Sequence, residues 1–210
     1  MKISTLVAMS IAALTLSGTA LVGCSSETNE GPEEPAALTA AEVSGRWVSG
    51  GCESYPDGNG GENHLTRDFT LTEKDWTLEL VVFGDDACSY PLFSAHVEGP
   101  YSLGALSEKV EGATEGNFEF GTIEWTALDQ GMADIFSQSG CGTGAWKVGE
   151  AQDVTATGCI GVAHAKSECP VDHDIVSLDG DTLFFGERVT DMCKEEGRPL
   201  SLGSYAVFKK

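Results

Sequence analysis

Hydrophobic and polar side chains alternate along much of the chain after residue 46, and this pattern predicts β-strands. In the segment 75–83 every second residue is apolar, namely Trp76, Leu78, Leu80 and Val82. The same alternation recurs at Phe93, Ala95 and Val97 and again at Phe118 and Phe120. A period of two puts these side chains on one face of each strand, which is typical of an antiparallel sheet with one buried face.

Further segments have strand-forming composition between turn residues: 45–49, 65–72, 99–103, 123–127 and 204–208. A hairpin is predicted where the Asp-Gly-Asp sequence at 179–181 separates the apolar runs 174–178 and 182–185, because Asp-Gly favours tight hairpin turns. The best helical candidate is 128–138, and it is short. The body of the chain is therefore predicted to be nearly all sheet.

The strand count predicts an all-β, antiparallel domain. About eight to ten strands in roughly 170 residues would leave exposed edges in an open sheet, and closure removes those edges. We therefore expect a closed barrel or a half-barrel, and a sandwich is the alternative. Glycine accounts for 26 of the 210 residues, and it supplies the turns that many short strands require.

The first 23 residues predict a signal peptide. Lys2 precedes an uncharged apolar run at 6–22, as in secretory signals. An uncleaved membrane helix is the alternative, because about 17 apolar residues is the minimum that spans a bilayer. The run ends in Leu-Val-Gly-Cys at 21–24, which resembles the lipobox of bacterial lipoproteins. We expect cleavage before Cys24 and acylation of Cys24, with palmitate-like chains as the membrane anchor.

Residues 24–43 predict a flexible acidic tether, since they combine Ser, Gly, Pro and Glu and contain no aromatic residue. The barrel domain is then expected at 44–210. Ser25, rather than Asp, follows the lipidated cysteine, which favours sorting to the outer membrane. The expected location is the bacterial cell envelope, with the protein lipid-anchored and facing the periplasm or the cell surface.

The charge balance excludes nucleic-acid binding. The chain has 33 Asp and Glu against 12 Lys and Arg, a formal net charge of -21, and no basic stripe. Such a surface repels a phosphate backbone. Hydrophobic residues make up 41% of the chain, which argues against disorder throughout. The acidic excess is best explained as a solvated surface.

Catalytic motifs are missing from the sequence. There is no Gly-x-Ser-x-Gly elbow, no His-Glu-x-x-His and no phosphate-binding glycine loop. The four histidines, His64, His96, His164 and His173, are scattered. We therefore expect no enzyme activity and no cofactor. Zinc at His164, Cys169 and His173 and calcium at the Gly-rich loop 57–63 are alternatives, but neither set of residues has the ligand spacing of a known metal site.

Six cysteines remain when Cys24 is set aside: Cys52, Cys88, Cys141, Cys159, Cys169 and Cys193. An even number in an exported chain predicts disulfides. Six cysteines allow 15 connectivities, and parity alone does not choose among them.

A series of short motifs resembles the APCDDC domain family over about 44–208. In order they are GRWVSGGCE at 45–53, LTR at 65–67, CSYP at 88–91, GPYSLG at 99–104, GATE at 112–115, CG at 141–142, WKVG at 146–149, QDVT at 152–155, GC at 158–159, LFFGER at 183–188 and RP at 198–199. The chain departs from the family at 54–56, where SYP opens a Gly-rich insertion. It also has a single copy, whereas a vertebrate Wnt antagonist of this family has two.

The resemblance implies a cysteine pairing. Four cysteines fall on family motifs, which favours Cys52 with Cys88 and Cys141 with Cys159; Cys169 and Cys193 are then each other's partner. Family motifs also contain Arg67, Arg188 and Arg198, while Arg46 neighbours Trp47. Arginines kept in so acidic a chain favour fixed bidentate partners. We expect Arg67 to pair with Glu53 as a structural ion pair.

The resemblance also implies an apolar barrel interior that holds an acyl chain, because family relatives bind lipidated Wnt and inhibit Wnt signalling. The expected lining is Trp76, Leu78, Leu80, Phe93, Ala95, Val97, Phe118 and Phe120. The first hypothesis is thus a membrane-anchored binding module for a lipid or another apolar ligand. The second is a non-enzymatic interaction protein that displays acidic loops to a protein or glycan partner.

Overall fold

The structure is a computed structural model that describes residues 35–56, 60–159 and 163–210. Eight antiparallel strands form a closed ring in the order β1, β3, β4, β5, β6, β9, β10, β11 and back to β1. Their bounds are β1 Gly45–Ser49, β3 Glu62–Leu71, β4 Asp75–Phe83, β5 Pro91–Leu106, β6 Thr114–Glu119, β9 Val171–Asp179, β10 Thr182–Phe185 and β11 Val207–Lys209. The prediction of an antiparallel barrel is confirmed.

Three short strands and three helical segments lie outside this ring. Strand β2 (Glu53–Pro56) pairs with β3, β7 (Thr122–Ala127) with β5, and β8 (Ala151–Asp153) with β7. The helices are α1 (Ala40–Val43), α2 (Gln130–Gln138) and the single 3-10 turn η1 (Glu195–Gly197). The sequence pattern did not predict β2 or β8, because segments of three or four residues are too short to show a period.

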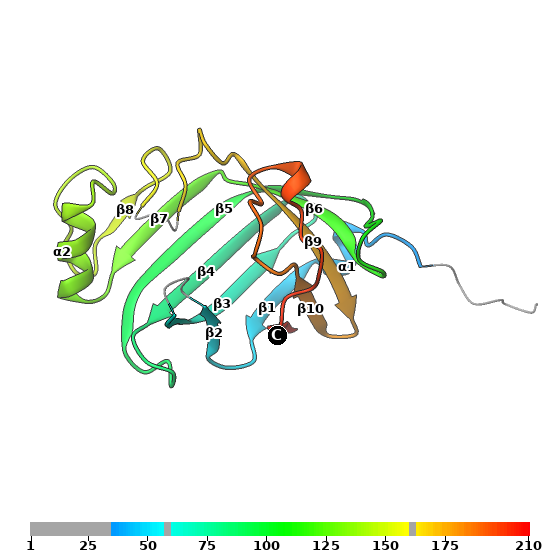
Figure 1. The fold of residues 1–210 in the computed structure, drawn as a ribbon, viewed down its shortest axis with the longest axis horizontal. Coiled ribbons are helices and arrows are strands. Elements are labelled where there is room, and N and C mark those ends of the chain that lie inside the picture. Colours follow the sequence, from blue (N-terminus) through cyan, green and yellow to red (C-terminus); the bar gives the residue numbers. More distant parts are fainter. Residues whose placement is uncertain (1–34, 57–59, 160–162) are drawn as a thin grey trace, which may run out of the picture. The chain divides into compact units, whose positions relative to one another are not determined.

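The two longest strands change partners partway along. Strand β5 pairs with β7 over 93–98 and with β6 over 101–106, while β4 runs along its other side. Strand β3 likewise pairs with β2 over 62–65 and with β1 over 68–71. The ring is therefore closed at one end only. At the other end β2, β3, β4, β5, β7 and β8 form a curved open sheet, with α2 beyond β7 (Figure 1).

Gly99 lies where β5 changes partners. A Cβ atom there would lie 2.0 Å from the backbone oxygen of Glu119 and 2.7 Å from the nitrogen of Gly121. The Gly121 N–H donates to Glu98 O at 2.7 Å, which holds the two segments together. Only glycine allows this approach. The segment 99–103, predicted as a separate strand, is instead the continuation of β5.

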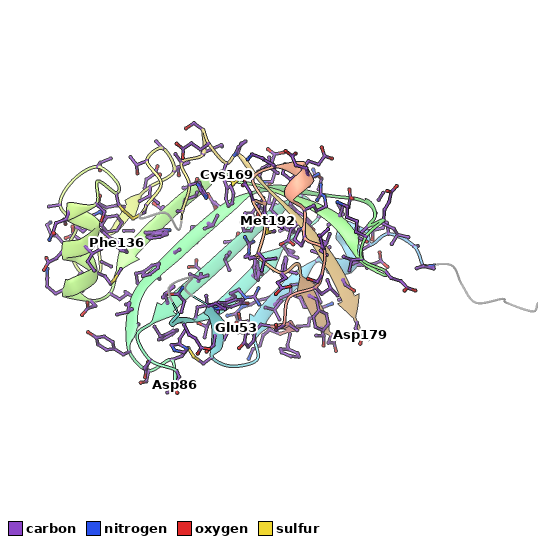
Figure 2. The ribbon with its side chains drawn as sticks, in the orientation of Figure 1. Glu53, Asp86, Phe136, Cys169, Asp179 and Met192 are labelled. Carbon is purple, nitrogen blue, oxygen red and sulfur yellow. A yellow bond between two sulfur atoms is a disulfide. The ribbon has the colours of Figure 1, made fainter. Side chains whose placement is uncertain are left out.

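Aromatic rings fill the closed end of the barrel. Trp47, Phe69, Trp76, Tyr101, Phe118 and Phe185 are each 7% exposed or less. Phe69 stacks on Phe185 with ring centroids 4.6 Å apart, and Phe118 meets Trp76 at 5.5 Å. A second group, Phe93, Trp125, Phe136 and Trp146, packs between α2 and the sheet, and Figure 2 shows Phe136 on the side of α2 that faces the strands.

The ordered domain begins earlier than the expected boundary at residue 44. Thr39 caps α1 with a capping box, and the Leu38 N–H donates to Thr114 Oγ1 at 2.8 Å. Val43 is 1% exposed, and its carbonyl accepts from Trp47 Nε1 at 2.8 Å. The prediction of a tether over 24–43 was therefore wrong for its last residues. The apolar Leu38 and Val43 supply the contacts that composition alone did not reveal.

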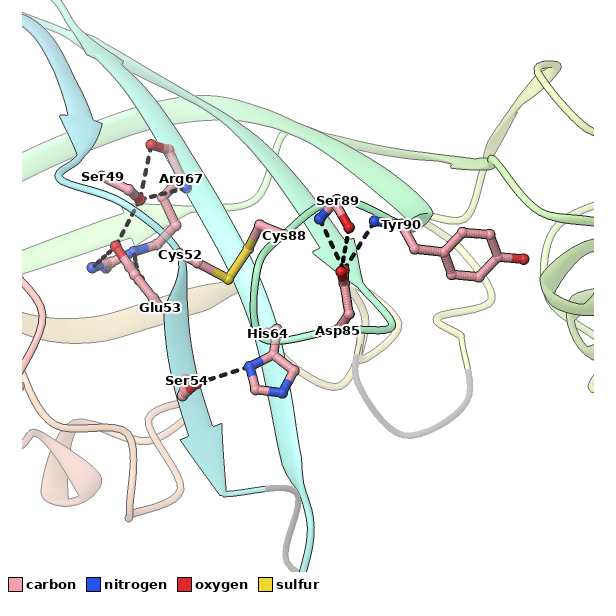
Figure 3. The surroundings of a disulfide bond; sticks show 10 residues. All are labelled: Ser49, Cys52, Glu53, Ser54, His64, Arg67, Asp85, Cys88, Ser89 and Tyr90. Atoms are coloured by element: carbon pink, nitrogen blue, oxygen red, sulfur yellow. Dashed lines mark hydrogen bonds and ion pairs between the residues drawn. A yellow bond between two sulfur atoms is a disulfide. The ribbon is translucent and has the colours of Figure 1, made fainter.

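Three disulfides brace the loops: Cys52–Cys88, Cys141–Cys159 and Cys169–Cys193. These are the expected pairs. Cys52–Cys88 joins the turn after β1 to the loop between β4 and β5 (Figure 3). A domain with three disulfides belongs in an oxidising, extracytoplasmic compartment.

Replacing Gly99 by alanine should destabilise the barrel by about 1–3 kcal/mol, because the new methyl overlaps backbone atoms that are held in hydrogen bonds. Gly104→Ala on the same strand is the matched control, since its Cβ would have no neighbour closer than 3.7 Å. Urea unfolding of both variants measures the difference. Equal stability of the two variants would contradict the close approach at Gly99.

Candidate functional site

The strand register places seven of the eight predicted lining residues on the inner face of the barrel, and Phe120, just after β6, contacts Trp76 with ring centroids 5.9 Å apart. On β4, Leu78 lies opposite Phe69 and Val97, and Leu80 lies opposite Arg67 and Ala95. Of the eight predicted residues, Trp76, Phe93, Ala95, Val97 and Phe118 are buried. The other three, Leu78, Leu80 and Phe120, are partly buried and pack against the same core. All eight therefore contribute to one apolar interior.

A strip of apolar side chains on β4 is only partly covered. Leu78, Leu80 and Val82 occupy consecutive inner-face positions, and each keeps partial exposure although it packs against the core. We call these three residues the apolar wall. Their partners on β5 lie in the half of that strand that pairs with β7 and not with β6, so the ring is open beside them.

A buried ion pair, in which both carboxylate oxygens are hydrogen-bonded, borders the apolar wall. Arg67 Nε donates to Glu53 Oε2 at 2.8 Å, and Arg67 Nη2 donates to Glu53 Oε1 at 3.1 Å. Ser49 Oγ donates to Oε1 at 2.6 Å, and Tyr55 OH donates to Oε2 at 2.9 Å. Arg67 Nη2 also donates to Tyr205 O at 2.9 Å. Figure 3 shows Ser49, Glu53 and Arg67 converging.

The geometry of this pair confirms the expected contact between Arg67 and Glu53. The two side chains are 11% and 3% exposed. The strand register brings the two side chains together. Glu53 lies opposite Leu65 on β3, and Leu65 is two residues from Arg67 on the same face of the sheet. Burial is the main cause that raises the pKa of Tyr55, and the neighbouring Glu53 adds to it. The two opposite charges are therefore buried together, and both carboxylate oxygens of Glu53 accept hydrogen bonds.

A second polar group lies on the inner face of β9. Asp172 and Asp174 are opposite Phe118 and Gly116 of β6, so both carboxylates point to the interior side. Arg188 Nη2 lies 2.5 Å from Asp172 Oδ2 and 3.8 Å from Asp174 Oδ2. We call these three residues the aspartate–arginine cluster.

Asp174 is the most perturbed acid of the cluster. Its Oδ1 accepts from the Ile175 and Gly186 N–H groups at 2.7 and 2.8 Å, while its Oδ2 has no hydrogen-bond partner among the described residues. Burial raises the pKa of the Asp174 carboxyl to about 7; Arg188 opposes this rise and Asp172 adds to it. Asp174 therefore changes charge near neutral pH.

Arg198 and Trp47 are buried and stabilise the fold. Arg198, 8% exposed, donates to Gly116 O and Asp174 O at 2.8 and 2.7 Å and to Asn117 Oδ1 at 2.9 Å. It thereby fixes the segment around η1 to β6 and β9. Trp47 is completely buried at the closed end of the barrel.

Two surface clefts lie among the described residues. One of about 310 Å³ lies between the turn after β1 and the start of β11, and it is lined by Gly50, Gly51, Cys52, Glu53, Ser204, Tyr205, Ala206 and Phe208. The other, of about 250 Å³, lies beside η1 and the β5–β6 turn and includes Glu195 and Arg198. Neither cleft contains a predicted lining residue.

Most residues of the two alternative metal sites lie within the described parts of the chain. Within residues 35–56, 60–159 and 163–210, no three His, Cys, Asp or Glu side chains come together as metal ligands. Cys169 is bonded to Cys193, and His173 Nδ1 contacts Asn117 Oδ1 at 2.9 Å. Residues 57–59 of the Gly-rich loop and Cys24, the predicted lipidation site, lie outside the described residues. No helix in the described ranges is long and apolar enough to cross a bilayer.

The sequence reasoning missed Tyr55, Asp172 and Asp174. A signal was available for Asp174, because it heads the predicted strand 174–178 and shares a face with Val176 and Leu178. An acid in an apolar row is the usual sign of a buried polar site. Tyr55 lies on a strand too short to be recognised.

A family model supports the resemblance noted in the sequence. The model for Adenomatosis polyposis coli down-regulated 1, the APCDDC domain, matches residues 27–170. The chain belongs to the APCDDC family. Within the matched APCDDC segment lie Trp47, Glu53, Arg67 and the apolar wall. Strands β9, β10 and β11, which close the ring, follow it, as do Arg188 and Arg198.

Glu53→Gln should lower stability by roughly 3–5 kcal/mol, because it leaves the buried Arg67 guanidinium without its counter-charge. Asp68→Asn is the control. Asp68 binds Arg46 on the outer face with side chains 31% and 59% exposed, so its loss should scarcely move Tm. Thermal unfolding compares them. If both variants have the Tm of the wild type, the Glu53–Arg67 pair does not stabilise the fold.

Proposed function

We propose that this APCDDC protein binds the acyl chain of a lipid, or another apolar ligand, against the apolar wall inside its barrel. The observation that carries the proposal is the partial exposure of Leu78, Leu80 and Val82, which face the interior beside the half of β5 that pairs with β7 and not with β6. Aliphatic side chains on an inner face are normally buried, and a row that stays partly exposed there offers a binding surface to an apolar ligand.

The energetics support such a ligand. Covering about 300 Å² of apolar surface contributes roughly 7–8 kcal/mol at about 25 cal/mol per Å². That is on the order of the free energy of micromolar binding. The aromatic residues at the closed end are already packed against one another, so the ligand would lie on the open half, between the apolar wall and the second aromatic group around Phe93.

We propose a binding function and not catalysis. Glu53, the carboxylate that the family motif places in the interior, already accepts four hydrogen bonds, from Ser49, Tyr55 and Arg67. A side chain held in that way positions strands and is poorly suited to act as a general base.

We further propose that the protein is a lipid-anchored lipoprotein of the bacterial cell envelope, acylated at Cys24 and sorted to the outer membrane. The support is the apolar run that ends in Leu-Val-Gly-Cys at 21–24, and the three disulfides agree with an extracytoplasmic domain. The anchor would hold the barrel close to the membrane, whose lipids are the proposed ligands.

Leu78→Trp should weaken binding of a fluorescent lysophosphatidylcholine at least tenfold, because the larger ring occupies the space over the apolar wall. Thr77→Trp is the matched control, since Thr77 is the neighbouring residue on the outer face of β4. Fluorescence titration of the purified chain gives both affinities. Equal binding by the two variants, or none by folded wild type, would favour the acidic-loop interaction function instead.

Cys24→Ser should move the protein from the membrane fraction to the soluble fraction, or leave its precursor unprocessed, because the acylated sulfur is lost. Fractionation and intact-mass measurement of the mature chain provide the test. A mature chain that begins at any residue other than Cys24 would refute the anchor.

A further inference from the structure

The aspartate–arginine cluster faces the Glu53–Arg67 pair across the barrel. Strand β9 is four strands from β3 in either direction round the ring of eight, so the two walls are opposite each other. Arg188 also lies near enough to Tyr55 to oppose the rise in its pKa. Both polar groups therefore border the interior that holds the apolar wall, where Leu80 is opposite Arg67.

The cluster has an unused donor and an unused acceptor side by side. Only Nη2 of Arg188 makes a hydrogen bond within the described residues, and the side chain is 58% exposed. The Oδ2 atom of Asp174 is buried and has no hydrogen-bond partner there. A buried acceptor without a hydrogen-bond partner lowers the stability of the fold, and a ligand that donates to it would remove this cost. Both carboxylate oxygens of Glu53, by contrast, have hydrogen-bond partners.

The charge of the cluster decides which headgroup fits. Two carboxylates share one guanidinium, so the cluster is negative when both are ionised. Arg198 donates to the Asp174 backbone oxygen and is itself 3.8 Å from Glu115, while Glu53 and Arg67 neutralise each other. An anionic headgroup would add a third negative charge beside Arg188. A hydroxyl-bearing, uncharged headgroup would accept from Arg188 and donate to Asp174 without that repulsion.

We propose that the aspartate–arginine cluster is a headgroup site that selects acyl ligands with an uncharged, hydroxyl-bearing headgroup over those with an anionic headgroup. The inference rests on the proposed function and names the ligand class of the same interior. Arg188 donates to an oxygen of the headgroup, and Asp172 and Asp174 exclude a carboxylate or phosphate.

The selectivity depends on pH, and the protonation of Asp174 decides whether an anionic ligand binds better at low or at high pH. Its pKa of about 7 makes it largely ionised at pH 8 and largely protonated at pH 6. Protonation removes one negative charge from the cluster, so an anionic ligand binds better at low pH. Laurate itself stays ionised at both values, since a free alkyl carboxylate has a pKa of about 4–5, like Glu. The affinity of an uncharged ligand does not rise when Asp174 is protonated, because there is no charge repulsion to remove.

The test compares laurate with 1-monolauroylglycerol, which share one acyl chain, by calorimetry on the full chain below micelle formation. If laurate binds only the form with protonated Asp174, its affinity should rise about tenfold from pH 8 to pH 6, while that of monolauroylglycerol changes less than about twofold. At pH 8 monolauroylglycerol should be the tighter ligand.

Asp174→Asn should bring laurate affinity at pH 8 up to its pH 6 value and abolish the pH dependence. Asparagine keeps an oxygen for the Ile175 and Gly186 N–H groups, so the variant retains the local fold. Asp179→Asn, at the exposed end of the same strand, should behave as wild type. Binding of both ligands without this pH dependence, or a pH dependence that survives in Asp174→Asn, overturns the headgroup site alone. Binding of neither ligand overturns the proposed function with it.

Discussion

The change of partners along β5 is the constraint on which the rest of the structure depends. Over its first half β5 pairs with β7, and over its second half with β6, so the barrel closes at one end only. Gly99 makes this possible, because no side chain fits between β5 and the turn at 119–121. Closure lets Trp47, Phe69 and Phe118 pack as a solid core. The lack of closure at the other end leaves Leu78 and Leu80 partly exposed.

Polar groups in the interior divide into two kinds with different consequences. In the Glu53–Arg67 pair both carboxylate oxygens are hydrogen-bonded, and the pair links β2, β3 and the chain before β11. The cluster of Asp172, Asp174 and Arg188 is unsaturated, because one guanidinium serves two acids. The first therefore stabilises the barrel, and the second provides the specificity of the proposed site.

Much of the fold was predictable from the sequence because period-two alternation is a direct consequence of strand geometry. The segments 45–49 and 75–83 were placed at the bounds of β1 and β4, and seven of the eight lining residues fell on the inner face. The contact between Arg67 and Glu53 followed from the charge balance together with the family motifs. The partner change at Gly99 and the roles of Tyr55 and Asp172 were not predictable, since they depend on which strands meet across the barrel.

The most direct test of the central claim is native mass spectrometry of the protein isolated from its own membrane. The account predicts a bound single-chain lipid, in addition to any acyl groups on Cys24, that leaves on collisional activation and has an uncharged, hydroxyl-bearing headgroup. A folded, disulfide-bonded chain that carries only its covalent modifications would contradict the claim that the open half of the barrel is a ligand site.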